Sequence, residues 1–218
     1  SVRMFHILTL LRDLGHKVTF LPDNLGDIPP YGDDIRKRGI EFVHHPYCKS
    51  VRSYLEKHGQ SLDVVILSRC DFARKHIAAT RQFAPQSWII FDTVDLHHLR
   101  LGREAELTKD PLIEATAAEK ERQEFELIDE VDETWVVSHY EQQLLEAKRP
   151  HGSIEVVPTI VEVRGSDTPF SLRHDFLFIG SFQPSPNAAA VLYFAQDVLP
   201  EILQPLHGIR FYVIGGKA

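Results

Sequence analysis

Apolar residues follow two different spacings along this chain, and the two alternate. Between Met4 and Leu14 they recur every three or four positions, which is the spacing of one helix face, and Gly15 follows where glycine commonly ends a helix. Continuous apolar runs, typical of buried strands, separate such segments. The pattern predicts helices within residues 4–14, 35–38, 50–58, 71–83 and 110–128, and strands at 18–21, 40–43, 63–67, 88–91, 134–137 and 154–157.

Capping residues mark two of the helix starts. Asp110 and Pro111 suit the N-cap and the first helical position, and Ser138 followed three residues later by Glu141 is a capping box. Strands that are apolar almost throughout, and that alternate with helices, indicate a parallel sheet covered on both faces. The sequence therefore predicts an α/β fold with one Rossmann-like parallel sheet for residues 1–162.

A polar, turn-rich stretch interrupts this alternation. Residues 165–169 read Gly-Ser-Asp-Thr-Pro, and we expect a linker at residues 163–174. A strand at 175–180, a helix that runs to Leu199 and a strand at 209–214 follow it. One strand–helix–strand unit is too small to form its own core, so residues 175–218 are predicted to begin an incomplete second Rossmann-like domain. No strand precedes the first helix either, and we expect the chain to lack part of the protein at both ends.

Composition narrows the class of protein. The 218 residues, 43% of them hydrophobic, can bury a real core, and the formal net charge of −7 disfavours nucleic acid and anionic membranes as general partners. Cys48 and Cys70 form neither a disulfide framework nor a zinc-ligand pair. No apolar run approaches the roughly 20 residues that span a bilayer. These features predict a cytoplasmic protein without a nucleic-acid partner.

Several longer stretches can be compared with a known family. The chain opens with SVRMFHILTLLRDLGHKVTFLPDN, continues through FDTVDLHHLRLGREAEL and DETWVVSHYEQQLL, and later carries FLFIGSFQPSPNAAAVLYF followed by FYVIGG. In this order and spacing they resemble the retaining, nucleotide-sugar-dependent glycosyltransferases of family 4, which have the GT-B fold. The last two stretches are similar to the start of that family's donor-binding domain.

The resemblance implies a function. It implies transfer of a sugar from a nucleotide-sugar donor to a glycan, lipid-linked or small-molecule acceptor, with no cofactor, since the nucleotide sugar is a substrate. It leaves open peripheral membrane association of the full-length protein. The chain departs from the family in lacking the glycine-bearing first strand and the donor-site glutamates, which would lie beyond Ala218. Residues 158–160 read Pro-Thr-Ile where Pro-Asn-Gly is commoner. We therefore expect this chain alone to be inactive.

Ionisable residues concentrate directly after the apolar run 88–91. Ligands of parallel α/β sheets bind at the carboxyl ends of the strands, so we expect Asp92, Asp95 and His97 to face a cleft between the domains. Carboxylates and imidazoles hydrogen-bond sugar hydroxyls and orient an acceptor, which makes these three the predicted catalytic residues. In the alternative, the two aspartates only cap the next helix, and the histidines and Arg100 are solvated. Adjacent histidines seldom chelate together, so no metal site is predicted.

Other strand ends and helix starts supply the remaining predicted contacts. Arginines and helix N-termini suit an anionic ligand, and glycine lets a backbone approach a diphosphate closely. For each residue the alternative is an ordinary cap, turn or exposed side chain. The predicted acceptor-binding residues are Ser1, Arg3, Ser68, Arg69, Arg100 and Arg103, and the predicted donor-binding residues are Gly180, Ser181, Phe182, Gly215 and Gly216.

Two other functional hypotheses stay open. The chain could be a non-catalytic α/β binding module, or a GT-B-like enzyme of another class such as a nucleotide-sugar epimerase or a phosphorylase. A phosphorylase would need a lysine for pyridoxal phosphate, and nothing in the sequence marks one. The charged segment 92–103 favours the transferase over the binding module.

Overall fold

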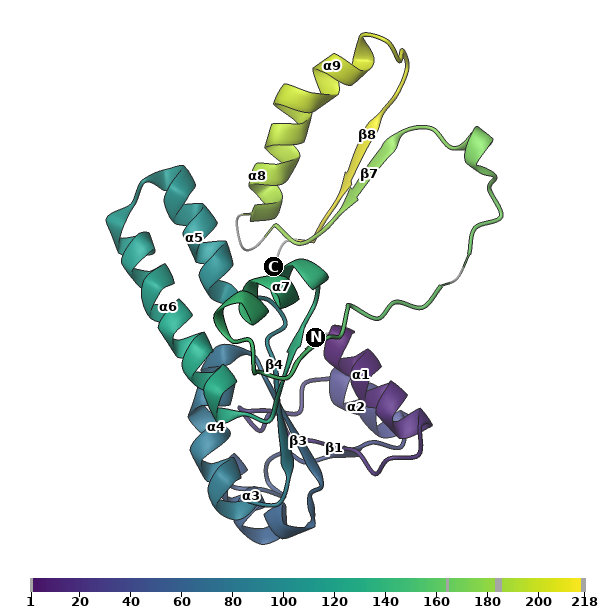
Figure 1. Cartoon of the computed structure of the whole chain (residues 1–218). Coiled ribbons are helices and arrows are strands. Elements are labelled where there is room, and N and C mark those ends of the chain that lie inside the picture. Colours follow the sequence, from purple (N-terminus) through teal and green to yellow (C-terminus); the bar gives the residue numbers. More distant parts are fainter. Residues whose placement is uncertain (1, 164, 183–185, 217–218) are drawn as a thin grey trace. The chain divides into compact units, whose positions relative to one another are not determined.

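The computed structural model describes residues 2–163, 165–182 and 186–216, and the chain divides into two compact units, Ser1–Val161 and Glu162–Ala218 (Figure 1). Both units combine helices with parallel strands. The α/β class and the parallel pairing predicted from the apolar pattern are therefore confirmed.

Helices and strands alternate through the first unit. The Asp110 carboxylate accepts the Leu112 amide and the Ser138 hydroxyl accepts the Glu141 amide, so both predicted helix starts are confirmed. The helices are α1 (Val2–Asp13), α2 (Tyr31–Lys37), α3 (Val51–His58), α4 (Cys70–Phe83), α5 (His97–Thr108), α6 (Pro111–Glu130) and α7 (His139–Lys148), with a 3-10 turn at Gly59–Ser61. The strands are β1 (Thr19–Phe20), β2 (Glu41–Phe42), β3 (Val64–Ser68), β4 (Trp88–Asp92), β5 (Glu133–Val136) and β6 (Ile154–Val156).

The main sheet of this unit contains β3, β4, β5 and β6 in that order, all parallel. Ser68 pairs with Asp92 and Asp92 with Trp135, so the carboxyl ends of three neighbouring strands lie side by side. In Figure 1, α3, α4 and α6 run along one side of this sheet, and α1 with α2 lies on the other. The order of strands thus brings residues from distant parts of the sequence to one edge.

The single sheet expected for residues 1–162 is wrong in one respect. Strands β1 and β2 pair with each other, Thr19 opposite Glu41 and Phe20 opposite Phe42, and form a separate two-stranded sheet. An apolar run shows that a strand exists but not which neighbour accepts its hydrogen bonds. This smaller sheet has its own core, made of Leu8, Ile35 and Ile40 with the surrounding aromatic rings of Phe5, Phe20 and Phe42.

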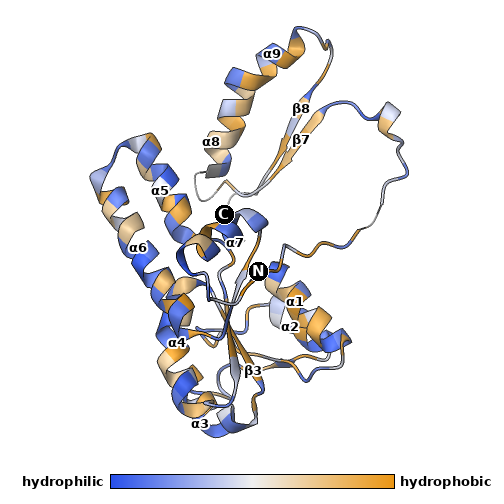
Figure 2. Cartoon of the chain, in the orientation of Figure 1, coloured by the Kyte–Doolittle hydropathy of each residue, from blue (hydrophilic) through white to orange (hydrophobic). Residues whose placement is uncertain are grey.

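The core of the main sheet lies between β4 and the helices that cover it. Ile89 and Phe91 are completely buried, and Leu127 of α6 and Leu145 of α7 pack in the same cluster. Figure 2 shows hydrophobic strands in the centre of the unit and helices with a hydrophobic and a hydrophilic side. Helix α6 also turns one acidic residue, Glu124, toward this interior.

The second unit is small. Strands β7 (Phe176–Ile179) and β8 (Phe211–Ile214) pair in parallel. After a 3-10 turn (Phe170–Leu172), its helical part runs through α8 (Pro186–Tyr193), a π-helical segment (Phe194–Val198) and α9 (Leu199–Leu203), four residues beyond the predicted Leu199. The Phe194 ring lies against Phe176 and Phe211 of the two strands. Within the ranges described for both units, every helix is too short or too polar to cross a membrane.

Candidate functional site

Asp92 stands at the carboxyl end of β4, where the sequence predicts a catalytic group. Its carboxylate is completely buried, with the Ser68 hydroxyl 3.1 Å from Oδ2 and the Arg3 guanidinium 2.7 Å from Oδ1. Both oxygens are therefore occupied by protein donors. Asp92 does not line an open surface as the sequence suggests, because its position next to the edge strand β3 and under α1 closes it off from solvent.

Arg3 joins three segments that are far apart in the sequence. Besides Asp92, it donates through Nη1 to the carbonyl oxygens of Val157 and Pro158, at 2.6 and 2.7 Å. Only 5% of Arg3 is exposed, and its Nε finds no hydrogen-bond partner among the described residues. The predicted acceptor-binding Arg3 and Ser68 are thus engaged with Asp92, and their charges and dipoles hold the start of α1 against the sheet.

Asp95 and His97 form the partly buried part of the constellation. His97 Nε2 lies 3.3 Å from Asp95 Oδ1, and Arg100 Nε lies 3.5 Å from the other carboxylate oxygen. Hydrogen bonding from His97 lowers the pKa of Asp95 below its usual 3.8, burial opposes this, and the charges of His97 and Arg100 add to the lowering. The Asp95 side chain is 43% exposed and that of His97 12%. These two predicted residues therefore lie together and within reach of a ligand.

The alternative in which Asp92 and Asp95 cap the next helix is wrong. The N-cap of α5 is Leu96, whose side chain has no atom that could accept a hydrogen bond from a backbone amide. Glu124 of α6 does this instead, because its carboxylate accepts the backbone N–H groups of His97 at 2.8 Å and His98 at 3.2 Å. The same carboxylate lies 2.5 Å from the Nδ1 atom of the His98 ring.

Glu124 is the residue that sequence reasoning missed, and one signal could have found it. Along α6 it lies seven residues after the buried Ala117 and four before the buried Ile128, on the same helix face. An acidic residue on an apolar stripe needs a buried partner. The partner is His98, next to the histidine that the sequence favoured.

The predicted arginines of this edge have exposed side chains. These are Arg69, Arg100, which pairs with Asp95, and Arg103; the side-chain hydrogen bonds to the Asp92 carboxylate come instead from Arg3 and Ser68. Arg69 adopts a positive φ of 69°, a conformation that costs roughly 1–3 kcal/mol in a residue other than glycine, while its N–H donates to the Asp92 carbonyl oxygen. Ser1, also predicted to bind the acceptor, lies outside the described residues.

The predicted donor-binding residues gather in the second unit at the carboxyl ends of β7 and β8. The Gly180 N–H donates to the Ile214 carbonyl oxygen at 3.0 Å, which places the two strand ends beside each other. A Cβ atom on Gly215 would lie 2.2 Å from the Phe182 ring and 2.5 Å from the Gly180 carbonyl oxygen. Gly215 is therefore required for close packing. The Ser181 carbonyl oxygen accepts from the Asn187 side chain, and Gly216 has open space around its Cα.

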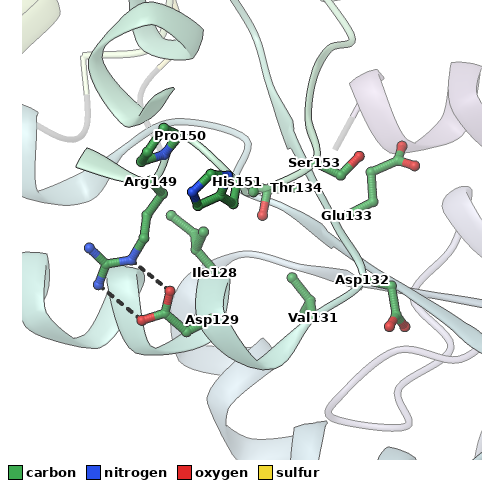
Figure 3. A pocket seen from close by; sticks show the side chains of 11 residues that line it. Ile128, Asp129, Val131, Asp132, Glu133, Thr134, Arg149, Pro150, His151 and Ser153 are labelled. Atoms are coloured by element: carbon green, nitrogen blue, oxygen red, sulfur yellow. Dashed lines mark hydrogen bonds and ion pairs between the residues drawn. The ribbon is translucent and has the colours of Figure 1, made fainter. Parts of the chain in front are cut away.

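Two surface pockets of the first unit lie away from all of these residues. One, of about 310 Å³, opens at the amino end of β5, where Arg149 and Asp129 form two parallel bonds of 2.6 and 2.9 Å (Figure 3). The other, of about 430 Å³, is lined by Asp23, Lys75 and His76 among others. Asp23 accepts a hydrogen bond from Lys75, and its Oδ1 also lies 2.6 Å from His76 Nε2, so its charge is satisfied internally. The candidate site is consequently defined by the side chains grouped at the carboxyl end of β4, and neither pocket contributes to it.

Comparison of the chain with protein-family models finds no match, and no curated protein matches it. Among the side chains that the structure describes, no three histidine, cysteine, aspartate or glutamate residues gather in a way that could hold a metal ion. The class established by the fold is an α/β protein with parallel sheets and a charged constellation at one sheet edge.

Proposed function

We propose that the chain belongs to a GT-B-type glycosyltransferase that moves a sugar from a nucleotide-sugar donor to a hydroxyl-bearing acceptor. In this proposal the first unit is the acceptor-type domain, and the second unit is the beginning of the donor-binding domain. The observation that carries it is the Asp95–His97 pair at the carboxyl end of β4, the position where α/β folds bind ligands. The glycines at the ends of β7 and β8 agree with a diphosphate loop in the second unit.

The geometry of His97 suits contact with a sugar. Asp95 lies against Nε2 of the ring, so it orients the imidazole and favours the tautomer that is protonated there. Within the described residues, Nδ1 has no hydrogen-bond partner, and it is not completely buried although only 12% of the side chain is exposed. In the neutral form of the ring, Nδ1 carries no proton and accepts a hydrogen bond from a hydroxyl group, which is what orienting a sugar or activating an acceptor hydroxyl requires.

Replacement of His97 tests the proposal. In the full-length protein we expect His97→Ala to lower turnover by about a hundredfold, the loss typical of a missing acid–base or positioning group, with little change in stability. The assay measures release of nucleoside diphosphate from a panel of nucleotide sugars in the presence of glycan and lipid-linked acceptors. The matched control is His151→Ala, which removes a histidine that lines the pocket at the amino end of β5.

Two results would contradict the proposal. If no nucleotide sugar in the panel is consumed by the unmodified protein, the chain is not part of a transferase for these donors. If His97→Ala transfers sugar as fast as His151→Ala, the reaction takes place away from the carboxyl end of β4.

A further inference from the structure

Glu124 makes more bonds than the packing of two helices requires. Its side chain is 1% exposed, yet it accepts two backbone N–H groups at the start of α5 and lies in hydrogen-bond contact with the His98 ring. A buried carboxylate is costly unless donors surround it, and here two backbone N–H groups and the positive end of the α5 dipole face it. Each carboxylate oxygen accepts one of these N–H groups, and both the N–H groups and the dipole stabilise negative charge. These contacts favour the ionised form of Glu124.

The ionised carboxylate in turn determines the state of the His98 ring. Because Glu124 has no proton to give, the short contact of 2.5 Å between Oε2 and Nδ1 requires the proton on Nδ1. The other ring nitrogen, Nε2, is buried and finds no partner in the described part of the chain. A proton on Nε2 would leave a buried donor unsatisfied, whereas a lone pair there costs less. These contacts favour the tautomer of His98 that carries its proton on Nδ1.

We propose that Glu124 is the positioning residue of the site at the carboxyl end of β4. One oxygen binds the His97 amide, and the other binds the amide and ring of His98, so the first turn of α5 has one allowed placement. Asp95 is only two residues before His97, and the contact between their side chains depends on where that turn begins. Glu124 thus acts through His97 rather than on a ligand. Its role in sugar transfer rests on the proposed function; its control of the Asp95–His97 contact does not.

Glu124→Gln tests the inference without changing the shape of the side chain. The glutamine oxygen can still accept the His97 amide, but its NH2 group then faces two donors at His98. The ring must move its proton to Nε2 to accept from the amide, and ¹⁵N NMR of the imidazole detects that change of tautomer. Without Glu124 the first turn of α5 is no longer held in one position. This should raise the pKa of Asp95 toward its usual 3.8, because the hydrogen bond from His97 that lowers this pKa is weakened.

The matched control is Glu126→Gln on the same helix. Glu126 is 46% exposed and pairs with Arg122 on the surface, so its replacement should leave the His98 tautomer and the Asp95 titration unchanged. His98→Asn should keep the Asp95 titration of the unmodified protein, because the side-chain NH2 group of asparagine can donate to Glu124 in place of Nδ1–H. His98→Leu cannot donate, and should shift the Asp95 titration as Glu124→Gln does.

The activity of the full-length protein supplies the second measurement. We expect Glu124→Gln to lower turnover by about 10- to 100-fold with little change in KM, because a small misplacement of a positioned group reduces the rate of the reacting complex. Normal turnover in Glu124→Gln beside impaired turnover in His97→Ala would overturn the positioning role in transfer.

The NMR measurement decides the structural part independently of activity. An Nε2–H tautomer of His98 in the unmodified protein overturns the inference even if every variant fails to fold. An unchanged Asp95 titration in Glu124→Gln overturns it as well. If the unmodified protein transfers no sugar, the proposed function fails, while the tautomer and the titration still show whether Glu124 sets the Asp95–His97 contact.

Discussion

Removing Asp92 should destabilise the first unit far more than removing an aspartate from a surface ion pair. In Asp92→Ala, the Arg3 guanidinium, 95% buried in the unmodified protein, keeps only the Val157 and Pro158 carbonyl oxygens as acceptors among the described residues, and the Ser68 hydroxyl loses its acceptor. Loss of one partner of a buried pair typically costs about 3–5 kcal/mol. Since whole domains have stabilities of only about 5–15 kcal/mol, this is a large part of the total.

The control is a pair with good geometry but open to solvent. Arg149 and Asp129 bond through two parallel contacts, yet their side chains are 38% and 52% exposed. Screening by water limits such a pair, so Asp129→Ala should cost about 1 kcal/mol or less. Replacing Arg3 and Asp92 together should cost less than the sum of the single changes, because the double variant leaves no unpaired buried charge.

Tryptophan fluorescence during urea unfolding measures these differences. The chain has two tryptophans, Trp88 in β4 and Trp135 in β5, so the signal reports the first unit alone. We expect a lower midpoint for Asp92→Ala with an unchanged slope, which signifies a change in stability. A cost below about 1 kcal/mol, equal to that of Asp129→Ala, would refute the reasoning. Normal stability combined with lost turnover would instead assign Asp92 the catalytic role that the sequence suggests.

Two further predictions concern a buried thiol and a glycine. Burial raises the pKa of Cys70 from its usual 9.0 to about 11, so the folded protein should react slowly with iodoacetamide at pH 8, and fast labelling detected by mass spectrometry would contradict this. Because the folded pKa is the higher one, the associated stability is complete below pH 9.0 and is lost as the pH rises through about 11. Gly215→Ala should destabilise the second unit by about 1–3 kcal/mol, because its new Cβ atom would meet the Gly180 carbonyl oxygen, which is backbone and cannot rotate away. Faster amide exchange at Gly180 measures this, with Gly216→Ala as the control that should show no change.

Local patterns in the sequence predicted most of the helices and strands, though not the bounds of α5, and predicted that the strands are parallel. Periodicity reports local geometry, and capping residues such as Asp110 and Ser138 act on amides only two or three positions away. The placement of Gly180 and Gly215 at one edge follows for the same reason, since the ends of consecutive parallel strands lie together. The grouping of Asp95 with His97 is also local, because only two positions separate them.

The tertiary structure alone decided which polar groups are buried and with what. Arg3 and Asp92 are 89 residues apart, and Glu124 reaches His98 from 26 residues away. A hydropathy scale predicts that all four side chains are exposed. It gives each residue type a fixed free energy of transfer out of water and does not include the hydrogen bonds that a partner supplies in the folded chain. The pairing of β1 with β2 likewise depended on hydrogen bonds between strands that no apolar run specifies. A buried charge becomes stable only when a donor from elsewhere in the chain meets it, and folding brings that donor into place.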